Sequence, residues 1–139
     1  MKNIYKISSF FLLSFVLFIY ACEHEQGAGP QGGGLQPTFS SIQDNILTPK
    51  CRNAGCHPGG GAPPSLPLQA GAAYDRLVNV QSAFGIPRVD PGNADNSALY
   101  LKVIGDNSVG SRMPLSRNAL SSEQTNAIRD WINNGAQNN

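Results

Sequence analysis

Two cysteines and a histidine lie within seven positions of one another in the segment KCRNAGCHPG, residues 50–59. Four residues separate Cys51 from Cys56, and His57 follows the second cysteine directly. The chain has 139 residues but only three cysteines and two histidines, so this segment holds most of its thiol and imidazole chemistry. Three kinds of chemistry use such residues: a disulfide, a zinc site and covalent attachment of haem.

A disulfide between Cys51 and Cys56 is possible in an exported protein. The loop that it would close is small, so its stabilisation lies at the low end of about 2–4 kcal/mol. A disulfide also has no use for His57. A zinc site is the weakest reading, because it needs four Cys or His ligands, and the adjacent Cys56 and His57 seldom both reach one tetrahedral ion without strain.

Covalent haem uses all three residues. Two thiols add to the two vinyl groups of the porphyrin, and a histidine directly after the second cysteine binds the iron, usually in the motif C-x-x-C-H. Here residues 52–55 make the spacer four residues long instead of two. The extra residues can bulge outward, because Gly55 gives the backbone conformational freedom. The motif alone favours haem only slightly over a disulfide.

A methionine strengthens the haem hypothesis. After residue 21 the chain contains one methionine, Met113, in the loop sequence SRMPL. Iron with His and Met as axial ligands suits electron transfer, because thioether ligation raises the reduction potential. A methionine is more often a gap-filling core residue, but this one precedes Pro114 in a polar loop. Met113 is therefore the candidate for the second axial ligand.

The N-terminus has the features of an export signal. Lys2 and Lys6 precede the apolar run of residues 10–20, which is short for a membrane-spanning helix. The run ends at Ala21 and Cys22, as in the signal of bacterial lipoproteins. We expect residues 1–21 to be a lipoprotein-type signal peptide and Cys22 to be lipidated; an ordinary signal peptide or an uncleaved anchor is the alternative. The domain is expected on the periplasmic or cell-surface side, lipid-anchored to the membrane.

Composition limits the remaining possibilities. Residues 22–37 are rich in Gly, Pro and Gln, which predicts a flexible linker. Without the two lysines of residues 1–21, eight Lys and Arg face nine Asp and Glu, a net charge of about −1. No basic patch remains, so the sequence does not support nucleic-acid binding.

Residues 38–139 are expected to form an all-α domain of three to five short helices with long Gly/Pro-rich loops. Apolar residues predict a first helix over residues 39–47, which Pro49 should limit. Residues 72–79 and 97–105 predict two more. The last helix is the clearest, with a capping box of Ser121 and Gln124. Gly135 should end it, and its apolar stripe is Ala127, Ile128, Trp131 and Ile132.

Over residues 39–136 the chain resembles the single-haem class I c-type cytochromes. The resemblance rests on CRNAGCH, on RMP and on LSSEQTNAIRDWINNGA, together with VDPGNADNSALYLKV before RMP. It implies a small cytochrome c-like fold around one covalently attached haem. Cys51 and Cys56 would carry the thioethers, and His57 and Met113 would be the axial ligands.

The resemblance also implies a set of supporting residues. A proline carbonyl after the histidine would accept its Nδ1–H, with Pro64 as the nearest match and Pro63 and Pro67 as rivals. The last helix would contact the first near the haem through Ile128 and Trp131. The chain departs from the family in its long cysteine spacer, and in Gln43 and Leu47, where Gly and an aromatic residue are common. The candidates for the pocket wall include Leu66, Leu68, Tyr74, Leu99, Tyr100 and Trp131.

With both axial positions filled by side chains, a substrate cannot reach the iron. The resemblance therefore implies an electron carrier rather than an enzyme, which exchanges single electrons with redox partner proteins. If Met113 does not bind, a five-coordinate haem peroxidase or gas-binding domain is the alternative. A structural lipoprotein with a Cys51–Cys56 disulfide and no haem is the other.

Overall fold

Short helices make up most of the regular structure of this protein. The computed structural model describes residues 34–52, 56–57 and 66–139, which all belong to one compact unit. Within this part of the chain, the extended pairings are two isolated bridges, Val78–Val89 and Gln81–Pro87. The all-α class expected from the sequence is thus confirmed. In order, the helices are α1 (Phe39–Ile42), the π-helix η1 (Gln43–Cys51), α2 (Ala73–Leu77), the 3₁₀ helix η3 (Ala94–Asn96), α3 (Ala98–Ile104), the 3₁₀ helix η4 (Asn107–Val109) and α4 (Ser122–Asn133).

The first helical segment continues further than the sequence predicts. The expectation that Pro49 limits it is wrong, because η1 contains Pro49 and ends at Cys51. In an α-helix the proline ring would clash with the carbonyl four residues earlier. A π-helix pairs each N–H with the carbonyl five residues back, as Arg52 N does with Leu47 O at 2.9 Å. The wider turn accommodates the proline and places Cys51 at the end of a helical segment that begins at Phe39.

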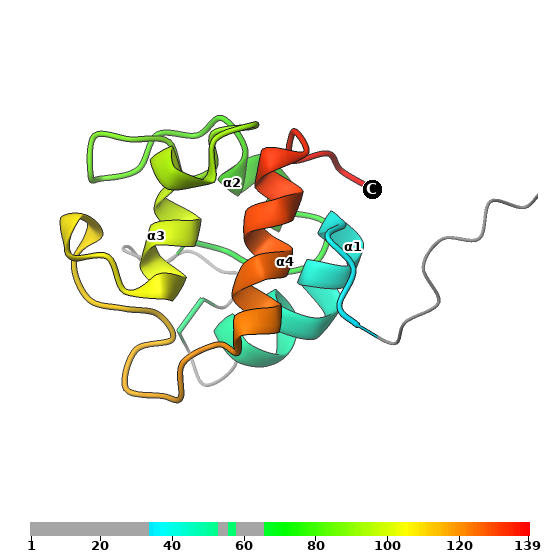
Figure 1. Cartoon of the computed structure of the whole chain (residues 1–139), viewed down its shortest axis with the longest axis horizontal. Helices are drawn as coiled ribbons and strands as arrows, with labels where there is room; N and C mark the ends of the chain where they lie inside the picture. Colours follow the sequence, from blue (N-terminus) through cyan, green and yellow to red (C-terminus); the bar gives the residue numbers. More distant parts are fainter. Residues whose placement is uncertain (1–33, 53–55, 58–65) are drawn as a thin grey trace, which may run out of the picture. The chain divides into compact units, whose positions relative to one another are not determined.

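α4 lies between α3 and α1 (Figure 1) and contacts both. Its apolar stripe is buried, as the sequence predicts. The Phe39 ring of α1 packs against Trp131 of α4, with ring centroids 5.4 Å apart. The same ring meets Tyr74 of α2 edge-on at 5.1 Å. Three helices far apart in the sequence are therefore joined at one aromatic cluster.

The N-terminus of α4 has the predicted capping box. Ser121 Oγ accepts a hydrogen bond from Gln124 N at 3.2 Å, and Gln124 Oε1 accepts one from Ser121 N at 3.1 Å. Gly135 follows the helix with φ of +94°, as a helix-ending glycine does. After α4 the chain folds back, and Trp131 Nε1 donates to Gln137 O at 2.8 Å.

Replacing Ser121 with alanine should lower the free energy of unfolding by about 1 kcal/mol, because the substitution leaves the Gln124 N–H without its acceptor. Urea denaturation followed by circular dichroism measures this change. Ser122→Ala is the matched control, since the exposed Ser122 lies one residue into the helix and does not cap it. Equal losses for the two variants would contradict the role of the box.

The folded domain also begins earlier than the expected boundary at residue 38. Leu35, in the predicted linker, packs against the core. Its N–H donates to the Glu123 carboxylate at 2.8 Å. The last residues of the predicted linker are therefore part of the fold. Residues 1–33, which include the predicted signal peptide and Cys22, lie outside the described residues.

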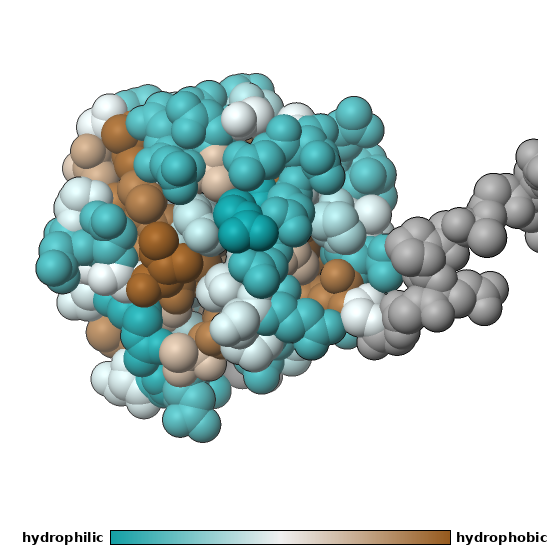
Figure 2. All heavy atoms as spheres, in the orientation of Figure 1, coloured by the Kyte–Doolittle hydropathy of each residue, from teal (hydrophilic) through white to brown (hydrophobic). Residues whose placement is uncertain are grey.

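The surface over α3 is apolar. Figure 2 shows apolar side chains gathered over this helix. Ile104 at its end and Phe84 in the preceding loop are large exposed apolar residues. Lys102 of α3 lies with its ammonium nitrogen 4.7 Å from the centroid of the Phe84 ring. This cation partly covers the ring and gains a favourable contact with its π face.

In the part of the chain that the structure describes, no helix is long and apolar enough to cross a membrane.

Candidate functional site

The two thiols differ in their surroundings. Cys51, at the end of η1, is half-buried and packs against the main core. Burial, and in second place the nearby Cys56 thiol, raises the pKa of Cys51 to about 11. Cys56 is exposed. Both cysteines are free thiols in the structure, so each has an unbonded sulfur available for chemistry.

His57 is oriented by a backbone carbonyl. Its Nδ1 lies 3.1 Å from Leu66 O. A carbonyl oxygen can only accept, so Nδ1 must carry the proton, and in the neutral ring the Nε2 lone pair is left for a metal ion. Imidazoles that bind metals are commonly held in this way. The half-buried His57 thus has the tautomer that a metal ligand needs.

The acceptor of the His57 hydrogen bond corrects one expectation. The resemblance implied a proline carbonyl; Pro63 and Pro64 lie outside the described residues, and the observed carbonyl belongs to Leu66 rather than to Pro67. The hydrogen-bond register between His57 and residues 66–68 explains why Leu66 is the acceptor. Leu68 N also donates to His57 O, at 3.4 Å, and the Leu68 side chain is buried in the core. This pairing brings the carbonyl of Leu66 to the imidazole.

The other residues expected in the pocket wall gather at one core. Leu68 and Trp131 are buried members of the main cluster of apolar side chains. Cys51 touches the same cluster, so the end of η1 and the expected wall share one apolar environment. The half-buried members of the expected wall that pack against this cluster are Leu66, Tyr74, Leu99 and Tyr100.

Met113 lies in the loop between α3 and α4. It is half-buried, and its N–H donates to Lys102 O at 2.9 Å, which ties the loop to α3. Pro114, the next residue, is buried. Among the described residues Met113 belongs to neither cluster of buried apolar side chains.

A cavity is lined by the sequence neighbours of Cys51 and Met113, although neither of these two residues lines it. It has a volume of about 460 Å³ and lies between the end of η1 and the loop after Met113. Lys50, the neighbour of Cys51, lines one side, and Pro114, the neighbour of Met113, lines another. Lys50 and Arg117 give the cavity two cationic groups, which suit a ligand with carboxylates. The complete lining is Pro49, Lys50, Pro114, Arg117, Asn118 and Ala119.

Reasoning from the sequence did not predict that Lys50 and Arg117 line the same cavity. The only sequence signal is that each lies within a few residues of a candidate ligand, Cys51 or Met113. Basic residues are ordinary on a surface, so that signal has little specificity. Only the fold places the two cations at the same cavity.

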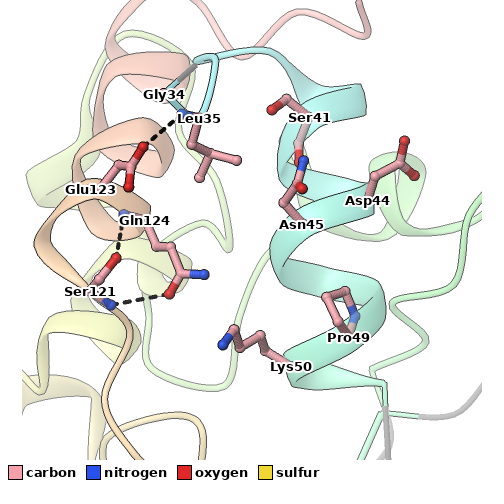
Figure 3. Close-up of a pocket in the computed structure, with 10 residues that line it drawn as sticks. All are labelled: Gly34, Leu35, Ser41, Asp44, Asn45, Pro49, Lys50, Ser121, Glu123 and Gln124. Atoms are coloured by element: carbon pink, nitrogen blue, oxygen red, sulfur yellow. Dashed lines mark hydrogen bonds between the residues drawn. The ribbon is translucent and has the colours of Figure 1, made fainter. Parts of the chain in front are cut away.

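A second cavity, of about 570 Å³, lies between η1 and the N-terminal end of α4 (Figure 3). Its walls carry polar side chains, among them Asp44 and Asn45 on one side and Glu123 and Gln124 on the other. The Glu123 carboxylate is already bound to Leu35 N. Like the first cavity, this one is lined by no cysteine, histidine or methionine of the described residues, and it shares Pro49 and Lys50 with it.

Zinc gains no support from the described residues. Within residues 34–52, 56–57 and 66–139, no group of three or more His, Cys, Asp and Glu side chains is placed to hold a metal ion. The arrangement that the structure does provide is two free thiols, one oriented imidazole and a separate methionine.

In the haem-free protein, iodoacetamide should modify Cys56 well before Cys51. At pH 8 a thiol with a pKa of about 11 is ionised in about one molecule in a thousand, and only the thiolate reacts quickly. Raising the pH towards 11 should bring the rate at Cys51 closer to that at Cys56. Peptide mass spectrometry after timed quenching measures both rates, with urea-unfolded protein as the control. Equal rates in the folded protein at pH 8 would contradict the burial of Cys51.

Comparisons with known proteins found no relative of this chain. No protein-family model, no curated protein and no solved structure matches this chain. The function must therefore be argued from the geometry of the site.

Proposed function

We propose that this chain is a monohaem c-type cytochrome that carries single electrons by outer-sphere transfer in an exported, membrane-tethered domain. The observation that carries the proposal is the orientation of His57. Its Nδ1 donates to Leu66 O at 3.1 Å, directly after a cysteine whose thiol is free and exposed. A disulfide staple would not require an oriented imidazole at this position.

The residues fit a covalently bound porphyrin. The free thiols of Cys51 and Cys56 would form the two thioethers, and the Nε2 of His57 would bind the iron from one side. Cys51 already packs against the apolar core, which suits a sulfur atom attached to a large apolar ring. The bound haem supplies a one-electron couple between Fe(III) and Fe(II).

Met113 would be the second axial ligand. Its loop is fixed to α3 by the hydrogen bond to Lys102 O, and the adjacent cavity reaches back to the end of η1. If both His57 and Met113 bound the iron, their side chains would exclude substrate from it. This arrangement favours an electron carrier over the five-coordinate peroxidase or gas-binding alternative.

The two cations at the cavity would hold the acidic edge of the haem. Lys50 and Arg117 line the same space as Pro114, and each can pair with a carboxylate. The apolar core, with Leu68 and Trp131, would keep water away from the porphyrin faces.

The exported location is part of the proposal. A lipid on Cys22 would tether the domain to the membrane, and redox partner proteins would be met on the periplasmic or cell-surface side. The near-neutral charge of the mature chain gives no support to a nucleic-acid partner.

The intact mass and absorbance spectrum of the mature protein test the proposal. The protein is made in a host that carries the cytochrome maturation system. We expect a mass larger by one haem, an intense Soret band and a low-spin spectrum with the weak charge-transfer band of methionine bound to Fe(III). A high-spin spectrum would favour the five-coordinate alternative. A colourless protein with Cys51 and Cys56 in a disulfide would overturn the haem proposal.

A further inference from the structure

Gln43 is a buried amide whose position the site described above does not explain. It lies in the first turn of η1 and is 4% exposed. Its Nε2 donates to Leu68 O at 3.1 Å and to Thr48 Oγ1 at 3.0 Å. Its Oε1 is buried and has no hydrogen-bond partner in the described part of the chain. An unpaired buried oxygen costs about 1–3 kcal/mol, so an apolar residue at this position would be the cheaper choice for stability alone.

The π-helical geometry of η1 places this amide. Hydrogen bonds in a π-helix connect residues five apart, and such turns occur frequently at functional sites. Gln43 and Thr48 are five residues apart, so the wide turn brings the Thr48 hydroxyl within reach of the Gln43 side chain. The second N–H of the amide then points to the backbone of the segment formed by residues 66–68.

That segment is also the one that orients His57. Leu66 O accepts from His57 Nδ1 at 3.1 Å, and Leu68 N donates to His57 O at 3.4 Å. Gln43 bonds to the same segment, at Leu68 O. Two hydrogen bonds, connected through the backbone of residues 66–68, thus link the Gln43 amide to the imidazole.

We propose that Gln43 is a positioning residue for His57. It fixes residues 66–68 to η1, so that the Leu66 carbonyl keeps the imidazole in one orientation and in the Nδ1–H tautomer. Because Cys51 ends the same π-helix, the anchor of the imidazole and the first thioether would then share one helical support. The effect on iron rests on the proposed function; the effect on the tautomer of His57 does not.

Gln43→Met tests the proposal, because methionine keeps the length of the side chain but cannot donate to Leu68 O. In the holoprotein we expect changed paramagnetic shifts of the His57 ring protons and a changed electron paramagnetic resonance spectrum. We also expect a higher reduction potential, since a weaker Nδ1–H hydrogen bond makes the imidazole a poorer electron donor to iron. Covalent attachment, measured by intact mass, should be unchanged.

Thr48→Val is the matched control. It removes the hydrogen bond from Gln43 to Thr48 but leaves the one to Leu68 O, so His57 signals and potential should stay those of the wild type. If Gln43→Met lowers the free energy of unfolding but leaves the His57 signals and the potential unchanged, Gln43 is merely structural and the proposal is overturned. A shift of the same size in Thr48→Val would overturn it as well.

A measurement on the wild-type protein keeps the proposal testable if Gln43→Met accumulates poorly. NMR of protein labelled with nitrogen-15 and carbon-13 should find His57 with a protonated Nδ1. It should also find couplings across both hydrogen bonds, from His57 Nδ1 to the carbonyl carbon of Leu66 and from Gln43 Nε2 to the carbonyl carbon of Leu68. The absence of either coupling would overturn the positioning role. A colourless wild-type protein that still shows both couplings would refute the haem proposal while supporting the role of Gln43.

Discussion

Replacing His57 with alanine is expected to reduce the yield of haem-bound protein to less than about a tenth of the wild-type yield. Loss of a second-sphere partner alone costs about 10–100-fold in affinity at metal sites, and this substitution removes the ligand itself. It also removes the hydrogen bond to Leu66 O, so the segment at residue 57 loses its side-chain contact with residues 66–68. The haem absorbance per mole of purified protein measures the yield.

His24→Ala is the matched control for this experiment, because His24 is the only other histidine of the chain and lies in the predicted linker. It should leave yield and spectrum unchanged. Holoprotein of His57→Ala with the wild-type low-spin spectrum would show that His57 is not the proximal ligand. Selective loss in His24→Ala would assign the ligand to the linker instead.

Replacing Met113 with alanine is expected to leave haem covalently attached and to lower its reduction potential by tenths of a volt, within the range of about 0.8 V that axial ligands span. A thioether ligand favours Fe(II), and its loss leaves the iron to water or to no ligand. Intact mass reports the attachment. Potentiometric titration followed by absorbance reports the potential, and the charge-transfer band of methionine ligation should disappear.

Leu115→Ala is the control for Met113→Ala. Leu115 is an exposed apolar residue of the same loop, so its loss tests whether any change in the loop alters the potential. We expect no change. A Met113→Ala protein with an unaltered spectrum and potential would remove Met113 from the ligand set and leave the iron with another distal group.

The part of the fold that the sequence determines is local. The capping box at Ser121 and the stripe that contains Trp131 both lie within α4, where a helical period and a cap decide the structure. Their prediction is confirmed by the hydrogen bonds between Ser121 and Gln124 and by the buried stripe. The all-α class follows from the same kind of pattern. The haem and its four attachment points, also read from the sequence, stay predictions.

The tertiary structure determined two features that local sequence patterns do not predict: where the first helical segment ends and which carbonyl binds His57. Pro49 reads as a limit to the first helix, yet the π-helical turn carries the chain to Cys51. The carbonyl at His57 belongs to Leu66, because that choice depends on how residues 66–68 register with the imidazole and with the core. Caps and apolar periods act between residues a few positions apart, so the sequence displays them directly. Gln43 bonds to Leu68, 25 positions away, and Lys50 lines a cavity together with Arg117, 67 positions away. Only packing of the helices around a common core brings such distant residues to one place.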